Sequence, residues 1–165
     1  MADEGLAGGD ATEAFWREYA EATGVTGAYE TVAFGDSPEM ATELAELVLV
    51  GTERATAGLA RDVEGPDAEA APVEGGHVVL VDGARRPRAV RRTTQLVRCR
   101  FDEVDEDFAR DEGEGERTLA WWRQGHRAYF GRPATREGWT FAGGDESVVL
   151  ERFAVVWTPE HADGR

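Results

Sequence analysis

One predicted helix carries the side chains best suited to chemistry. Trp122 and His126 lie one turn apart on the helix predicted at 118–130, and Arg123 directly follows the tryptophan. An indole beside an imidazole offers a stacking surface and a proton carrier that works near neutral pH. The alternative for both rings is packing in the core. Arg123 either binds a phosphate or pairs with the acidic run 111–116.

Glu151 is a second candidate, because it stands among apolar residues of the longest and most apolar predicted strand, 147–157. An unpaired buried carboxylate costs on the order of several kcal/mol. We therefore expect Glu151 to meet an arginine, either Arg54 or Arg92. Such a pair is structural, or in the open mouth of a barrel it orients the edge of a nucleic acid base.

Positive charge is concentrated in one stretch of the chain. Residues 85–100 hold seven arginines, whereas residues 101–116 hold nine acids and one arginine. One interpretation is that the two blocks neutralise each other across a strand–helix junction. The other is that the arginine strip faces RNA phosphates while the rest of the surface is acidic.

The residue types that are missing exclude several classes of site. All 18 basic residues are arginine, so a Schiff base, a lysine general base and a P-loop lysine are ruled out. Cys99 is the only cysteine, which excludes an internal disulfide and any multi-cysteine metal site. His77 has no neighbours at metal-ligand spacing. We predict neither a metal site nor a cofactor.

The composition indicates one globular domain. The chain has 165 residues, 41% of them hydrophobic, and a net charge of −15, which on average repels polyanions. No apolar run reaches the length of about 20 residues that a membrane span needs, and the acidic N-terminus is unlike a signal peptide. We expect a cytoplasmic monomer or homodimer with its domain at 11–158 and flexible ends at 1–10 and 159–165.

Helical and strand patterns predict an α+β fold. Asp10 to Glu13 has the spacing of a capping box, and Ser37-Pro38 has the form of a helix start. The elements do not alternate as βαβ units do, which favours a small curved or closed sheet flanked by helices. Helices are predicted at 11–23, 38–50, 104–112 and 118–130, strands at 54–59, 77–81, 88–101 and 147–157, and loops at 61–75 and 131–146.

Several sequence segments, taken in order, carry a family resemblance. They are Phe34-Gly-Asp-Ser-Pro-Glu39, Gly51-Thr-Glu-Arg-Ala-Thr56, Val79-Leu-Val-Asp-Gly83, Arg92-Thr-Thr94, Phe101-Asp-Glu-Val104, the run from Phe108 to Arg123 with its Glu-Gly-Glu-Gly motif, His126, and Val149-Leu-Glu-Arg-Phe153. Together they resemble the longer bacterial branch of the ASCH family. The resemblance implies a PUA-like fold, a small β-barrel flanked by helices, that binds RNA or modified nucleosides.

The resemblance also implies candidate catalytic residues. Some family members look like nucleases, and short members look like amidohydrolases that deacylate N4-acetylcytidine through a lysine, a threonine and a glutamate. Matched to those motifs, the threonine falls on Thr56 and the glutamate on Glu112. The lysine falls on Glu53, which reverses the charge that would activate a threonine hydroxyl. Arg54 is adjacent, but an arginine guanidinium is a poor general base.

Two functions follow as hypotheses. The first is a module that binds RNA or a modified nucleoside or nucleotide in a cleft where residues 54–56, 92–94 and 112–122 converge. Its binding residues would be Arg54, Thr56, Arg92, Thr93, Trp122, Arg123 and Glu151. The alternative is a small hydrolase, either a ribonuclease or an N4-acetylcytidine-type amidohydrolase. Its catalytic residues would be Thr56, Glu112, Thr118 and His126.

Overall fold

A computed structural model describes residues 4–64, 68 and 71–164 of the chain. The contacts between residues divide the chain into two compact units. Unit 1 comprises residues 1–51, 74–94 and 153–165, and unit 2 comprises residues 52–73 and 95–152. The outermost predicted flexible residues, 1–3 and 165, lie outside the described residues, as does part of the predicted loop 61–75.

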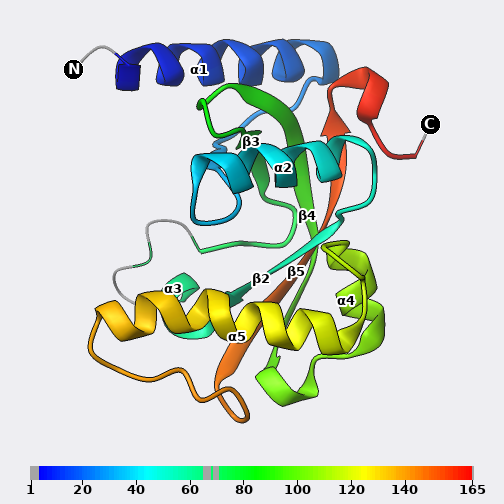
Figure 1. Cartoon of the computed structure of the whole chain (residues 1–165). Coiled ribbons are helices and arrows are strands. Elements are labelled where there is room, and N and C mark those ends of the chain that lie inside the picture. The colour runs from blue at the N-terminus through cyan, green and yellow to red at the C-terminus, as the bar shows by residue number, and fades with distance from the viewer. Residues whose placement is uncertain (1–3, 65–67, 69–70, 165) are drawn as a thin grey trace. The chain divides into compact units, whose positions relative to one another are not determined.

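Helices and strands are mixed along the chain (Figure 1). In chain order they are α1 (Glu4–Thr23), β1 (Glu30–Val32), α2 (Pro38–Leu49), β2 (Ala55–Leu59), α3 (Ala60–Val63), β3 (His77–Val81), β4 (Pro87–Arg100), the 3-10 turn η1 (Phe101–Glu103), α4 (Glu106–Glu112), α5 (Leu119–Arg136), β5 (Ser147–Trp157) and the 3-10 turn η2 (Pro159–His161). This content confirms the predicted α+β class.

The strands form a mixed five-stranded sheet in the order β1-β3-β4-β5-β2. β1 runs parallel to β3, whereas β3 with β4 and β2 with β5 are antiparallel pairs. In the β2–β5 pair, Thr56 stands opposite Glu151. β4 belongs to unit 1 up to Thr94, and β5 belongs to unit 1 from Phe153 onward.

The core of unit 1 is organised by β3, whose side chains point alternately to its two faces. Val79 packs in one apolar cluster with Trp16 and Tyr19 of α1, and the next residue, Leu80, packs in another with Val48 of α2. Successive side chains of a strand point to opposite faces, so the two helices cover opposite faces of β3.

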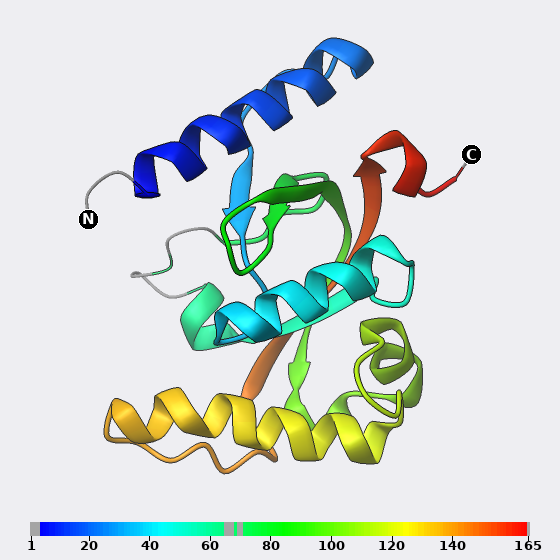
Figure 2. The same cartoon turned by 45° about the horizontal axis from the view of Figure 1, so that its top comes forward.

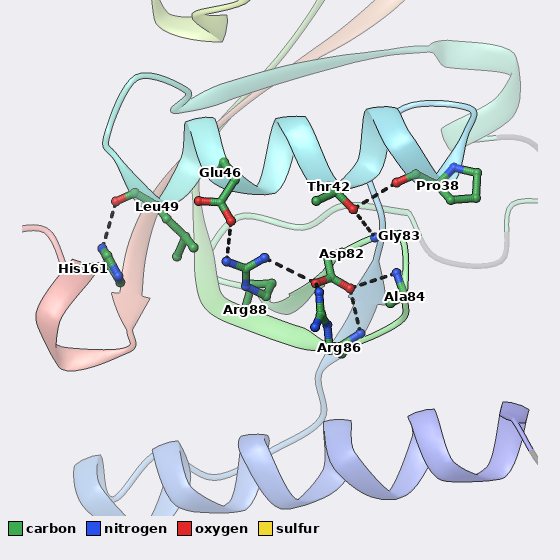
Figure 3. Close-up of polar contacts among 10 residues, drawn as sticks. All are labelled: Pro38, Thr42, Glu46, Leu49, Asp82, Gly83, Ala84, Arg86, Arg88 and His161. Carbon is green, nitrogen blue, oxygen red and sulfur yellow. Dashed lines mark hydrogen bonds and ion pairs between the residues drawn. The ribbon is translucent and has the colours of Figure 1, made fainter.

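Asp82 fixes the turn between β3 and β4, as Figure 3 shows. Its fully buried carboxylate accepts hydrogen bonds from the backbone N–H groups of Ala84 and Arg86, at 2.9 and 3.1 Å. The same carboxylate pairs with the guanidinium groups of Arg86 and Arg88, and Arg88 reaches on to Glu46 of α2. Burial alone raises the pKa of Asp82, but these hydrogen bonds outweigh it and lower the pKa below its ordinary value.

Unit 2 has an aromatic core. Phe101, Phe108, Trp122 and Phe130 pack there with aliphatic residues of β2 and β5, and Cys99 is half-buried against them. Figure 2 shows α5 as the long yellow-to-orange helix of this unit.

Two helix boundaries and one strand differ from the prediction. α1 begins at Glu4 rather than at residue 11, so the expected cap at Asp10 lies inside the helix. Adding a turn to a helix that packing already holds costs less than starting one. α5 continues through Pro133 to Arg136 because Ala134 extends the buried stripe one turn past Phe130. The three-residue strand β1 had no recognisable pattern.

The N-terminus of α2 begins as predicted and touches the β3–β4 turn. The Ser37 side chain accepts a hydrogen bond from the Met40 N–H at 3.1 Å. Thr42 Oγ1 donates to the Pro38 carbonyl and accepts from the Gly83 N–H (Figure 3). In the part of the chain that the structure describes, no helix is long and apolar enough to cross a membrane.

Replacing Gly83 tests the contact between α2 and the β3–β4 turn. A Cβ at Gly83 would lie 1.9 Å from the Pro38 carbonyl oxygen, so Gly83→Ala must displace the turn from α2. We expect a loss of about 1–3 kcal/mol in the free energy of unfolding, measured by urea denaturation. Gly131→Ala in α5 is the control, because a Cβ there meets nothing within 4 Å. It should stabilise the protein by about 0.5–1 kcal/mol, and equal effects of the two changes would contradict the account.

Candidate functional site

Glu112 ends α4 beside the start of β2. Asp105 caps α4 by accepting a hydrogen bond from the Phe108 N–H at 2.9 Å, and Gly113 ends the helix in the left-handed conformation. A Cβ at Gly113 would lie 2.2 Å from the Thr52 carbonyl oxygen, so only glycine permits this approach. The Arg54 N–H donates to the Asp111 carbonyl at 2.8 Å. The segment that carries Glu112 is therefore fastened to the residues that lead into β2.

Thr118 starts α5 and thereby places Trp122 and His126. Its side chain accepts a hydrogen bond from the Trp121 N–H at 3.2 Å, which is the geometry of an N-cap. One turn apart, the rings of Trp122 and His126 stack with their centroids 4.0 Å apart. Trp122, His126 and Glu112 are buried, with 1, 7 and 2% of their residue surface exposed.

Glu112 and His126 form a buried pair. The indole N–H of Trp122 donates to Glu112 Oε2, and His126 Nε2 lies 2.9 Å from Glu112 Oε1. On its other side, His126 Nδ1 lies 2.9 Å from the Trp122 carbonyl oxygen. A carbonyl oxygen only accepts, so Nδ1 carries a proton. Nε2 faces a carboxyl oxygen, so the pair holds one more proton between Nε2 and Oε1, which is the arrangement of an imidazolium–carboxylate ion pair.

The pKa values agree with this assignment. Burial by itself lowers the pKa of His126, but the charge and hydrogen bond of Glu112 and the Trp122 carbonyl outweigh it, and the net shift is upward from 6.5. Glu114 lies half-buried next to the pair. Burial, together with repulsion from Glu112, raises the pKa of Glu114 to about 7. The sequence analysis did not select Glu114 as a candidate. The signal that could have found it is the pair of glycines on either side of it, which indicates a tight loop.

The structure corrects two expectations for α5. Trp122 is enclosed and its ring stacks on His126, so the predicted stacking surface for a ligand is wrong. Among the described residues, Arg123 contacts η1 and the residue after it rather than the run 111–116, against the pairing alternative. Its guanidinium donates to the backbone carbonyls of Asp102 and Val104, at 3.0 and 3.3 Å, and holds η1 against α5.

Thr56, Glu151 and the segment of Glu112 lie together in unit 2. Thr56 is half-buried directly across the β2–β5 ladder from Glu151, which is 6% exposed. α4, which ends in Glu112, packs against β2. Glu53, at the position of the family's lysine, is also buried. Arg54 is half-buried, and its guanidinium donates to the Glu53 carbonyl at 2.7 Å.

The other two candidate residues belong to unit 1. Arg92 is exposed on β4, opposite His77 of β3. Thr93 is buried, and its N–H donates to the Gly76 carbonyl at 3.0 Å. The convergence of residues 92–94 with the unit 2 residues stays a prediction.

Ion pairs neutralise much of the arginine strip 85–100. Arg100 pairs with Asp102 and Glu103 of the acidic block, as the first interpretation predicted. The other partners lie elsewhere in the chain. Arg86 and Arg88 meet Asp82, Arg88 also meets Glu46, and Arg98 meets Glu64. Arg91 is buried, with its guanidinium over the rings of Phe34 and Phe153.

The buried pair predicts how stability depends on pH. The pKa of His126 and that of Glu114 are both raised by folding, so the folded protein binds more protons than the unfolded chain. The contribution of His126 is fully present below about pH 6.5 and is lost as pH rises through its folded pKa. Glu114 lowers stability as pH rises from 4.5 to about 7. We expect the urea midpoint to fall steadily from pH 5 to pH 9.

The double variant Glu112→Gln/His126→Gln removes both charges of the pair. Above pH 8, where Glu114 with its pKa of about 7 has largely titrated, the urea midpoint of this variant should no longer change with pH. His161→Gln is the matched control, because His161 lies in unit 1 and contacts the Leu49 carbonyl. That variant should keep the wild-type slope. An unchanged slope in the double variant would refute the assignment to His126.

Comparisons with known proteins agree with this architecture. A family model of the ASCH domain matches residues 30–157. The crystal structure of an ASCH domain from Lactobacillus crispatus JV V101 is similar, with a TM-score of 0.81, 29% identity and coverage of 90% of this chain and 96% of that one. A protein from Enterococcus faecalis V583 is also similar, with a TM-score of 0.80, 29% identity and coverage of 89% and 88%. No curated protein matches the chain significantly.

The likeness to a solved ASCH domain covers nearly the whole chain and confirms the expected α+β, PUA-like fold. The resemblance found in the sequence motifs is also confirmed, since the matched region begins at β1 and ends with β5. Because the family model covers well over half of its residues, the chain belongs to the ASCH domain family.

Proposed function

We propose that this protein binds RNA or a modified nucleoside through polar groups of unit 2. The ASCH family is generally associated with RNA binding. The observation that carries the proposal is the pairing of Thr56 with Glu151 across β2 and β5, beside the segment that ends in Glu112. A hydroxyl and a carboxylate on adjacent strands form a donor–acceptor set of the kind that small-molecule sites use.

The chemistry of this pair suits the edge of a base. A glutamate carboxylate accepts hydrogen bonds from an exocyclic amino group such as N4 of cytosine. A threonine hydroxyl both donates and accepts, so Thr56 can serve a neighbouring ring nitrogen or carbonyl. Arg54, two residues before Thr56, supplies a positive charge for a phosphate. Cytidine and its derivatives are therefore the first ligands to test.

The hydrolase alternative has less support from the geometry. Both ring nitrogens of His126 face oxygen acceptors, so the ring has no free position to take up a proton. Both oxygens of Glu112 are likewise engaged, and Thr118 caps α5. Of the four catalytic candidates, only Thr56 has no such structural contact among the described residues. We therefore favour binding over catalysis.

Thr56→Val and Glu151→Gln test the proposed site. Losing a hydrogen bond to the ligand costs about 1 kcal/mol for the neutral group and more for the charged one, so cytidine affinity should fall about fivefold and at least tenfold, respectively. Isothermal titration calorimetry measures the affinity, and Thr56→Ser should restore it by returning the hydroxyl.

Thr140→Val and Glu116→Gln make the same two substitutions at exposed loop positions of unit 2 and serve as controls. They should bind as wild type does. All variants are compared after circular dichroism has shown that they are folded. If the wild-type protein binds neither cytidine, N4-acetylcytidine nor short single-stranded RNA at low salt, the proposal is wrong.

The protein should not deacylate N4-acetylcytidine at the rate of an enzyme. General-base help contributes about 10²–10⁴ in rate, and a buried carboxylate, Glu53, stands where the family's short members have their lysine. Chromatography of N4-acetylcytidine incubated with purified protein should show no cytidine beyond the uncatalysed rate. Multiple turnovers that Thr56→Val abolishes would contradict this expectation.

A further inference from the structure

The region of α5 is positively charged throughout. From Arg117 to Arg136 the chain has five arginines and no Asp or Glu, although its net charge is −15. Two of these arginines are used inside unit 2. Arg117 donates to the Arg110 carbonyl, and Arg123 donates to the carbonyls of Asp102 and Val104. The remaining three are Arg127, Arg132 and Arg136.

These three arginines share the solvent-exposed face of α5. The exposed residues recur every one to four positions and make a continuous stripe, which consists of Ala120, Gln124, Arg127, Ala128, Arg132, Thr135 and Arg136. The opposite side of the helix is buried through Trp122, His126, Phe130 and Ala134. We call the exposed stripe the α5 face.

Aromatic rings lie beneath two of the guanidinium groups. Arg127 lies over the Phe101 ring at 5.4 Å from its centroid, and Arg132 lies over the Tyr129 ring at 5.7 Å. Among residues 4–64, 68 and 71–164, no carboxylate forms an ion pair with Arg127 or Arg136. The arginine strip 85–100 differs in this respect, because ion pairs occupy much of it.

The residue types on the α5 face indicate which kind of partner it can bind. It has no exposed Trp, Phe or Leu, which a membrane-surface helix or the centre of a protein interface needs. Small side chains such as Ala128 and Thr135 lie between the arginines and let a backbone approach closely. Arg127 and Arg136 are nine residues apart, about 14 Å along the helix and half a turn around it, so they mark the two edges of the α5 face and a strand that meets both must cross that face. Guanidinium groups match phosphate oxygens in charge and geometry.

We propose that the α5 face binds the phosphate backbone of an RNA strand through Arg127, Arg132 and Arg136. The choice of RNA rests on the proposed function, but the surface is separate from the Thr56–Glu151 pair. The α5 face would supply affinity that does not depend on sequence, whereas the base site would supply discrimination.

A salt titration tests the proposal directly. Binding of a fluorescein-labelled oligouridylate of about 12 nucleotides to the full chain is followed by anisotropy at several salt concentrations. Each phosphate contact contributes about −0.7 to the slope of log affinity against log salt for a single strand. Arg127→Gln/Arg136→Gln should therefore reduce the slope by about 1.4 and weaken binding roughly tenfold at low salt.

Arg17→Gln/Arg110→Gln is the matched control, since it removes the same charge from exposed residues of α1 and α4. It should keep the wild-type slope. The proposal is overturned if the α5 variant keeps the wild-type slope or if the control loses as much. It is also overturned if polyglutamate of equal charge displaces the RNA as well as unlabelled RNA does, which would indicate an acidic protein partner.

A cytidine titration separates this proposal from the base site. The α5 variant should keep the wild-type affinity for cytidine, and Thr56→Val should keep the wild-type salt slope for RNA. If wild type fails to bind cytidine but its RNA binding still depends on Arg127 and Arg136, the base site fails and the α5 face stands. Loss of cytidine binding in the α5 variant would count against two separate surfaces.

Discussion

The carboxylate of Glu112 receives the indole N–H of Trp122 at one oxygen and faces the imidazole of His126 at the other. This contact joins the end of α4 to the first two turns of α5. A buried ion pair of this kind is costly to break, because the partner that remains is a charge without water. The aromatic core of unit 2, the Glu114 loop and the approach of Gly113 to Thr52 are all arranged around it.

The same contact bears on function. A histidine and a glutamate ten to twenty residues apart suggest acid–base catalysis when only their types and spacing are known. In the structure each finds its partners inside the protein, and the ring that was expected to stack on a ligand stacks on the histidine. Thr56 of β2, opposite Glu151 of β5, and the arginines of α5 are the groups on which the proposed binding rests. The geometry therefore favours a binding domain.

Local patterns predicted most of the fold. The Ser37-Pro38 start of α2 and the whole of β5 were recognisable because capping and apolar alternation are properties of neighbouring residues. α5 is longer than predicted because the packing of Ala134 extends the helix past the weak local signal of Pro133. Burial was harder to predict than element type, and Trp122 shows why. An amphipathic helix indicates which residues share a face, but it does not indicate whether that face meets solvent or another helix.

Charge was the least predictable property. A count along the chain singled out residues 85–100, yet Arg88 and Arg98 meet acids more than thirty residues away. Such pairs cannot be predicted from neighbouring residues in the sequence. The exposed arginines of α5 were not singled out by that count, because on α5 the useful signal was the absence of acids rather than an excess of arginines.

The protonation state of His126 tests the central claim most directly. Long-range ¹H–¹⁵N correlation spectra of the ¹⁵N-labelled protein distinguish a cationic imidazole from either neutral tautomer. At pH 7 the account predicts that both ring nitrogens of His126 show the shifts of protonated nitrogen, and that Glu112→Gln converts the ring to a neutral form. A wild-type spectrum with one unprotonated nitrogen at pH 7 would mean that His126 is free to accept a proton, and the case for binding over catalysis would fail.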